Sequence, residues 1–179
     1  MTDQADPKRL LAAGSLALAG VLAASAAVAS PARPAPLSQT RSFQVPAPCA
    51  RLMTLFTAQG ERAWAPGWDP EILSGDTARG SVFRTRTPER ETVWAVSEYR
   101  PEQGRVSYVR IAQGSNMGLV DVSCRDVPAG GSEVTVTYTL TGLTPDGEAF
   151  VREFLDPKRY DDFIGEWRDA IATHLKAQP

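Results

Sequence analysis

The most regular stretch of the chain is its last long run, residues 156–176, in which large apolar residues recur at steps of three and four. These residues are Tyr160, Phe163, Ile164, Trp167, Ile171 and Leu175. The spacing predicts an amphipathic helix with one apolar stripe and a charged opposite face. Asp156 followed by Pro157 is a typical helix start, because an acid caps free backbone N–H groups and proline fits the first helical position. A stripe of this length predicts a broad apolar surface for the helix to cover.

From residue 71 onward the hydrophobic period changes to two, which indicates strands with one dry face and one wet face. The clearest example is 133–140, where Val134, Val136, Tyr138 and Leu140 alternate with Glu and Thr. After a first strand at 41–45, the pattern predicts strands at 71–73, 81–86, 92–99, 106–111, 118–127 and 133–140. Short turns containing Gly, Pro, Ser or Asn separate most of them, so we expect consecutive strands to pair antiparallel.

Two short helices are predicted between the first two strands. Cys49, Leu52, Met53 and Phe56 follow an i, i+3, i+4, i+7 pattern that favours one helix, and residues 57–64 predict a second. This order predicts an α+β fold in which a strongly curved, antiparallel, seven-stranded sheet wraps around the C-terminal helix. Because one helix is too narrow to fill the concave side, we expect a gap lined by apolar and aromatic residues.

A set of short motifs is shared with one known superfamily. The motifs are Leu55-Phe56-Thr57, Gly60-Glu61, Trp64-Ala65-Pro66-Gly67-Trp68-Asp69-Pro70, Trp94 with Tyr99, Tyr108-Val109-Arg110, Val136-Thr137-Tyr138, Thr141-Gly142-Leu143 and Glu166-Trp167. With them the chain resembles the SRPBCC superfamily, whose START-like helix-grip fold also occurs in polyketide cyclases and the birch-pollen allergen group. The resemblance covers about residues 41–175 and implies a cavity for an apolar small molecule. It implies no single reaction, because the superfamily mixes lipid carriers, cyclases and proteins of unknown role.

The N-terminal segment, residues 1–29, is predicted to be a signal peptide. Lys8 and Arg9 precede an uncharged run that ends in Ala27-Val28-Ala29, a small-x-small cleavage pattern. Cleavage after Ala29 would leave a linker at 30–40 and a domain at 41–179, outside the cytoplasm and either periplasmic or secreted. The alternatives are an uncleaved membrane anchor and an upstream extension from a wrong start codon, which would leave the protein membrane-anchored or cytoplasmic.

The composition excludes several kinds of site. The net charge is −2 with both signs scattered along the chain, so there is neither a basic nucleic-acid face nor a polybasic membrane patch. One histidine and two cysteines nearly exclude the common zinc sites, which use three or four such ligands. We expect no metal, no cofactor and no nucleic-acid partner, with membrane contact only through an uncleaved N-terminal segment.

The candidate ligand-contacting residues are mostly aromatic residues of the predicted strands and helices. They are Phe56, Trp64, Trp68, Phe83, Trp94, Tyr108, Val122, Val136, Tyr138, Phe154, Phe163 and Trp167. Each also fits plain core packing, and Trp64 and Trp68 also fit an anchoring role for the two short helices. Tyr138 is the best polar candidate, because a buried phenol requires a hydrogen-bond partner. That partner is either a ligand oxygen or a backbone or water oxygen.

The two cysteines of the chain, Cys49 and Cys124, both lie on predicted apolar faces. In the topology that the resemblance implies, they lie at the same end of the sheet. Export would expose them to an oxidising compartment, where a disulfide forms if the Cα atoms lie within about 7 Å. The alternative is a pair of buried free thiols.

The sequence favours binding over catalysis. It contains no Ser-His-Asp order, metal-ligand spacing or phosphate-binding glycine loop. We expect a non-enzymatic protein that buries a hydrophobic small molecule or lipid between the sheet and the C-terminal helix. The alternatives are a polyketide cyclase/dehydrase-like enzyme acting on an apolar carbonyl compound, and a structural or partner-binding domain with a collapsed cavity.

Overall fold

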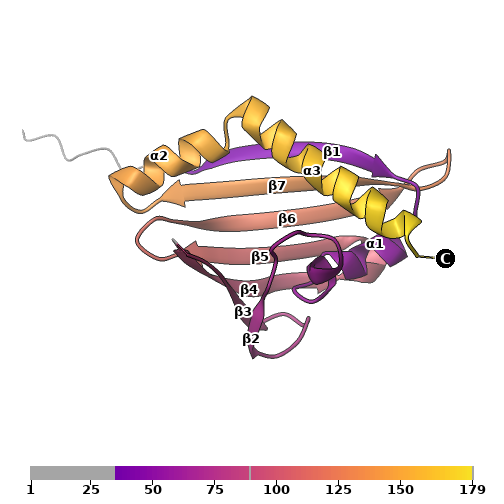
Figure 1. Ribbon diagram of the computed structural model, residues 1–179, viewed down its shortest axis with the longest axis horizontal. Coiled ribbons are helices and arrows are strands. Elements are labelled where there is room, and N and C mark those ends of the chain that lie inside the picture. The colour runs from indigo at the N-terminus through magenta and orange to yellow at the C-terminus, as the bar shows by residue number, and fades with distance from the viewer. Residues whose placement is uncertain (1–34, 89, 179) are drawn as a thin grey trace, which may run out of the picture. The chain divides into compact units, whose positions relative to one another are not determined.

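Seven antiparallel strands form one sheet within residues 35–88 and 90–178, the parts of the chain that the computed structural model describes. The strands are β1 Leu37–Val45, β2 Glu71–Ser74, β3 Val82–Thr87, β4 Arg90–Arg100, β5 Arg105–Ala112, β6 Asn116–Asp126 and β7 Ser132–Gly142. Their order in the sheet is β1-β7-β6-β5-β4-β3-β2. Strands β2 to β7 therefore form a meander, and β1 closes onto the last strand (Figure 1). This is the predicted helix-grip arrangement.

The helices are α1 Cys49–Leu55, α2 Pro145–Phe154 and α3 Pro157–Lys176, with short 3-10 helices η1 Gly60–Ala63 and η2 Pro101–Gln103. Helices α1 and α2 lie at opposite ends of the sheet (Figure 1). The second short helix, predicted at 57–64, is only the single turn η1. Helix α2 was not predicted as a separate element. It begins where the Thr144 hydroxyl accepts a hydrogen bond from the Gly147 N–H at 3.1 Å.

Strand β1 begins at Leu37, within the 30–40 segment that was predicted to be linker. Hydroxyl pairs on the wet face join β1 to β7: Ser38–Thr139 at 3.0 Å, Thr40–Thr137 at 2.8 Å and Ser42–Thr135 at 2.7 Å. Cross-strand hydroxyl pairs of this kind stabilise a sheet. Because the segment is rich in small polar residues, it lacks the apolar alternation that would have identified it as a strand. The predicted signal peptide, residues 1–29, lies outside the described residues.

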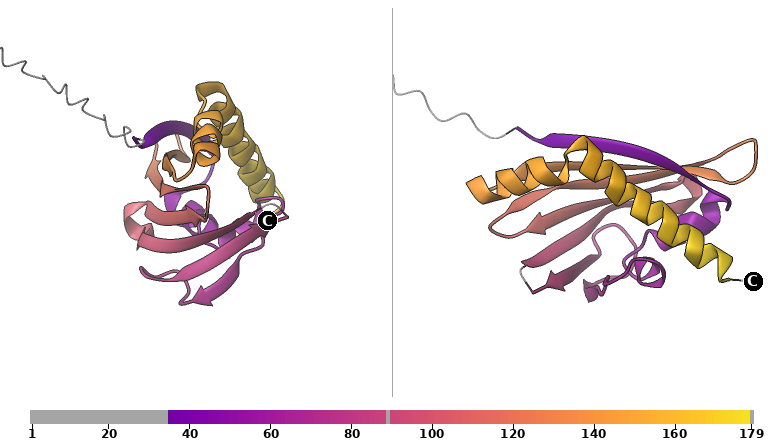
Figure 2. Two further views of the ribbon diagram at one scale, coloured as in Figure 1. Left: turned by 90° about the vertical axis from the view of Figure 1, so that its left-hand side faces the viewer. Right: turned by 45° about the horizontal axis from the view of Figure 1, so that its top comes forward.

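Helix α3 begins as predicted: the Asp156 carboxylate accepts hydrogen bonds from the N–H groups of Lys158 at 3.0 Å and Arg159 at 3.2 Å. The helix crosses the concave face of the curved sheet (Figure 2). Of the strands, β1 is the one that its backbone accompanies most extensively. The Tyr160 hydroxyl donates to the Val136 carbonyl at 3.1 Å and connects the helix to the middle of β7, the second strand from this edge of the sheet.

The two cysteines are bonded to each other in the structure. Cys49 at the start of α1 and Cys124 on β6 form a disulfide with Cα atoms 5.7 Å apart. The Cys49 N–H also donates to the Asp126 carboxylate at 2.8 Å. This hydrogen bond is the main reason that the pKa of Asp126 lies below its ordinary value. Helix α1 is thus fixed to the end of β6 by one covalent bond and one charge-assisted hydrogen bond.

Candidate ligand cavity

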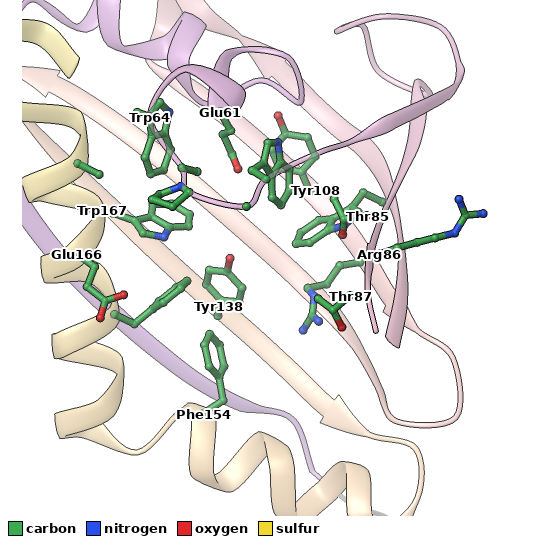
Figure 3. Close-up of a pocket in the computed structure, with 18 of the residues that line it drawn as sticks. Glu61, Trp64, Thr85, Arg86, Thr87, Tyr108, Tyr138, Phe154, Glu166 and Trp167 are labelled. Carbon is green, nitrogen blue, oxygen red and sulfur yellow. The ribbon is translucent and has the colours of Figure 1, made fainter. Parts of the chain in front are cut away.

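A cavity of about 400 Å³ lies between the sheet and α3 (Figure 3). Its volume falls within the range of small-molecule sites. Its buried lining residues are Trp64, Phe83, Trp94, Tyr108, Arg110 and Tyr138, and its exposed ones are Pro66, Gly67, Arg86, Thr87 and Glu166. Half-buried residues make up the rest of the lining: Glu61, Ala65, Trp68, Thr85, Phe150, Phe154, Phe163, Trp167 and Ala170. The cavity therefore has a buried, mainly aromatic floor and an opening at exposed residues.

The sheet wall of the cavity is one aromatic cluster, the sheet-side cluster, made of Trp68, Phe83, Trp94 and Tyr108. Phe83 on β3 lies opposite Trp94 on β4, and their rings stack at 5.8 Å between centroids. Edge-to-face contacts of 5.6 to 6.4 Å join the other rings. The sequence did not reveal which face of β4 is dry, because the strand has an irregularity between Val96 and Glu98 that breaks its alternation.

The opposite wall is a second cluster, the helix-side cluster, made of Phe163 and Trp167 on α3, Phe154 at the end of α2 and Tyr138 on β7. Its rings meet at centroid distances of 5.2 to 6.5 Å. Among the described residues, no ring of this cluster lies within aromatic contact of the sheet-side cluster. The cavity is the space that separates the two clusters.

Trp64 and Trp68 hold the segment that covers one end of the cavity. The Trp64 indole donates to the Leu55 carbonyl at 2.8 Å, and the Trp68 indole donates to the Ala58 carbonyl at 2.8 Å. Both rings also line the cavity. The anchoring role and the lining role, which the sequence left as alternatives, therefore belong to the same residues.

Most of the predicted ligand-contacting residues line the cavity: Trp64, Trp68, Phe83, Trp94, Tyr108, Tyr138, Phe154, Phe163 and Trp167. Phe56, Val122 and Val136 do not. Phe56 is buried behind the rings of Trp64 and Trp167. Val122 and Val136 pair across β6 and β7 in the packed part of the core. Strand alternation identifies the dry face but not the place where the helix stands away from it, so these three assignments to the cavity were wrong.

The two cavity tyrosines differ in what their hydroxyls contact. The Tyr108 hydroxyl donates to the Phe56 carbonyl at 2.6 Å and is already satisfied. The Tyr138 hydroxyl makes no hydrogen bond within the described residues, and it points into the cavity (Figure 3). Burial raises the pKa of Tyr138, so its hydroxyl stays neutral and available as a donor.

Glu61 in η1 lines the cavity, although the sequence pointed to it only as part of the shared Gly60-Glu61 motif and not as a ligand contact. Its carboxyl points into the cavity toward the Tyr138 hydroxyl (Figure 3) and makes no hydrogen bond or ion pair among the described residues. Loss of hydration there raises the pKa of Glu61 to about 8. Gly60 permits this placement, because a Cβ there would lie 2.0 Å from the Thr54 carbonyl oxygen. A glycine directly before Glu61 is therefore required for the close packing of η1 against the end of α1.

Arg110 on β5 is the second cavity residue that appeared only in a shared motif, Tyr108-Val109-Arg110, and was not predicted to contact a ligand. It is 8% exposed, lines the cavity, and donates from Nη1 to the Asn116 side-chain oxygen at 2.8 Å. Its Cζ lies 5.4 Å from the centre of the Trp94 ring. Burial lowers the pKa of Arg110, but a guanidinium remains charged in proteins. The sequence contains one indication of this position: Arg110 lies two residues after Tyr108 on the same strand, so both side chains lie on the dry face.

The described residues contain no group of three or more His, Cys, Asp or Glu that could hold a metal ion. No helix among the described residues is long and apolar enough to cross a membrane. Arg86, Thr87 and Glu166 supply polar groups at the exposed opening, and the polar groups deeper in the cavity include the Glu61 carboxyl, the Tyr138 hydroxyl and the Arg110 guanidinium.

Comparison with known sequences gives one family match. A model of the family described as polyketide cyclase/dehydrase and lipid transport matches residues 36–165. A search of curated proteins found no match.

Solved structures with the same fold are only distantly related in sequence. Norcoclaurine synthase from Thalictrum flavum superposes with a TM-score of 0.61 at 13% identity, covering 96% of this chain and 100% of that chain. An uncharacterised protein from Rhizobium leguminosarum gives 0.60 at 13% identity, covering 80% and 97%. The major latex-like protein 151 of Panax ginseng gives 0.59 at 12% identity, covering 78% and 97%. At these identities the likeness shows the fold alone.

Proposed function

The chain belongs to the polyketide cyclase/dehydrase and lipid transport family of the SRPBCC superfamily, and from this premise we propose that it binds a hydrophobic small molecule or lipid in its cavity. The observation that carries the proposal is the separation of the sheet-side and helix-side clusters by about 400 Å³ of space. Aromatic walls of this kind gain free energy when an apolar ligand displaces water from them. A cavity of this size argues against the alternative of a structural domain whose cavity has collapsed.

Uptake of a neutral apolar fluorophore, N-phenylnaphthylamine, tests this function. We expect saturable binding by the protein, followed by fluorophore emission. Ala170 lines the cavity from α3, so Ala170→Trp should fill the space and abolish uptake while the protein stays folded. Thr173→Trp, at an exposed position on the same helix, is the matched control and should bind like the parent protein. Equal uptake by both variants, or no uptake by the parent protein, contradicts the proposal.

A second candidate function is catalysis on an apolar carbonyl compound. It is favoured by Glu61 and Tyr138, two polar groups that converge in the cavity, one of them with a pKa of about 8. A carboxyl with a pKa near the working pH is suited to general acid–base catalysis. Norcoclaurine synthase, which shares the fold, is named as an enzyme. Mass spectrometry of apolar carbonyl compounds after incubation separates the two: unchanged compounds support binding, and converted compounds support catalysis.

We also propose that the protein is exported. The support is the leader at residues 1–29 together with the Cys49–Cys124 disulfide, since disulfides persist in oxidising compartments. The intact mass of protein from its native host should correspond to a chain that starts at Ser30. Alkylation of the denatured protein should label both cysteines only after reduction. A full-length, membrane-bound species with free thiols contradicts export.

A further inference from the structure

The charge on Arg110 is not balanced by the described part of the chain. The guanidinium is buried at the cavity floor. It takes part in none of the ion pairs among the described residues, and neither of the acids that line the cavity, Glu61 and Glu166, forms an ion pair with it there. A buried charge without a counter-charge is costly. A ligand that supplies a negative charge at the cavity floor would offset this cost.

The guanidinium is oriented by neutral partners. Nη1 donates to Asn116 at 2.8 Å, and the Asn116 amide donates in turn to the Ser115 hydroxyl at 2.9 Å. Asn116 is fully buried, so this short chain fixes the position of the guanidinium without neutralising it. The site is therefore built in advance, which lowers the free-energy cost of binding a charged group.

Part of the guanidinium is left for a ligand. The Nε atom is the sole side-chain nitrogen or oxygen among the described residues that is inaccessible and without a partner. The Nη2 atom makes no hydrogen bond to the described residues either, and unlike Nε it keeps some accessible surface, so it is the atom that a ligand can reach. The Tyr138 hydroxyl lines the same cavity and is also without a partner among the described residues, and the Arg110 charge acts against the burial that raises the pKa of Tyr138.

We infer that the ligand is an amphipathic organic acid whose single carboxylate pairs with Arg110 and accepts a hydrogen bond from Tyr138, with its apolar body between the sheet-side and helix-side clusters. A carboxylate supplies the missing counter-charge and forms charge-assisted hydrogen bonds with a guanidinium. The charge of Arg90, a second cation, acts in the same direction as burial to lower the pKa of Arg110, which favours an anion further. This inference rests on the proposed function and specifies the ligand class of the same cavity.

The test compares two ligands that share a tail and differ in the head. Decanoate and decanol each compete against N-phenylnaphthylamine at neutral pH. We expect decanoate to displace the fluorophore at a concentration at least about tenfold lower than decanol. Equal displacement by the acid and the alcohol overturns the inference. If the fluorophore does not bind at all, the proposed function fails instead, so the two failures are distinguishable.

The Arg110→Met variant tests whether Arg110 causes the preference for decanoate over decanol. Methionine keeps much of the side-chain volume and removes the charge, so the variant should lose the preference for decanoate and bind decanol within about twofold of the parent protein. Arg105→Met, on the same strand but exposed, is the matched control and should keep the preference. A preference that survives in a folded Arg110→Met overturns the inference. If that variant does not fold, the comparison of acid and alcohol in the parent protein still decides.

Discussion

Helix α3 presents two neighbouring apolar stripes to two different surroundings. One stripe, Tyr160, Ile164 and Ile171, is exposed by 2% or less. The other, Phe163, Trp167 and Ala170, is half-buried and borders the cavity. The first stripe belongs to the packed half of the interior, and the second to the hollow half. Neighbouring positions of one helix, such as Ala170 and Ile171, therefore face the cavity and the packed core respectively.

The opposing strands differ in the same way. In the packed half, β7 offers Val134, Val136 and Leu140, which are fully buried. In the hollow half, β3 to β5 offer the large rings of Phe83, Trp94 and Tyr108, which stack on one another instead of on the helix. Aliphatic side chains interlock between layers, whereas rings that pack within one layer leave a space in front of them. The difference separates the part that holds the fold from the part that is available to a ligand.

The largest expected effect concerns the packed stripe. Ile171→Ala should lower the free energy of unfolding by about 2–5 kcal/mol, because it opens a cavity in a closed core. Phe163→Leu, in the hollow half, should lower it by less than about 1.5 kcal/mol and weaken fluorophore binding instead. Denaturant unfolding and fluorophore titration measure the two effects. Equal destabilisation by both changes would remove the distinction between the halves.

The sequence predicted the packed half better than the hollow half. The alternation of β7 and the stripe of α3 were sufficient to predict the sheet, the long helix and most of the aromatic lining. Helix α2 was missed because Phe150 and Phe154 alone define too short an apolar pattern. Glu61 was missed as a cavity group because it lies in the short turn η1, which has no hydrophobic period from which its direction could be predicted. Arg110 was missed because strand alternation reveals which face is dry, not where a polar side chain on that face has room. Val136 was assigned to the cavity for the same reason, since helix α3 covers it through Tyr160.

A pH effect of intermediate size is expected in the hollow half. The folded protein holds the Glu61 proton up to about pH 8, whereas the unfolded chain releases it near the ordinary value of 4.5. Between these values the folded state binds more protons, so this group makes stability fall as pH rises. Glu61→Gln should remove that slope and be more stable than the parent protein at pH 8 by roughly 1–3 kcal/mol. Thermal unfolding from pH 5 to pH 8 measures the slope, and an unchanged slope in the variant would place the carboxyl in water.

The smallest effects come from a matched pair of tyrosines. Tyr160→Phe removes a buried hydrogen bond to the Val136 carbonyl in the packed half and should cost about 1–2 kcal/mol of stability. Tyr138→Phe removes a hydroxyl that has no partner among the described residues, so stability should change by less than about 0.5 kcal/mol. Affinity for a polar-headed apolar ligand should drop by about tenfold in Tyr138→Phe. If Tyr138→Phe lost stability and kept its affinity for the ligand, the Tyr138 hydroxyl would be a structural group and not a ligand contact.

The central claim is that a ligand occupies the space between the two aromatic clusters, and the four tryptophans of the chain test it most directly. All of them, Trp64, Trp68, Trp94 and Trp167, line the cavity. Their indole N–H resonances can be followed by NMR during titration with N-phenylnaphthylamine. We expect all four indole signals to shift saturably with one affinity, while the methyl signals of Ile171 and Val136 stay in place. Saturable binding that leaves the indole signals unmoved, or that moves the methyl signals instead, would contradict the central claim.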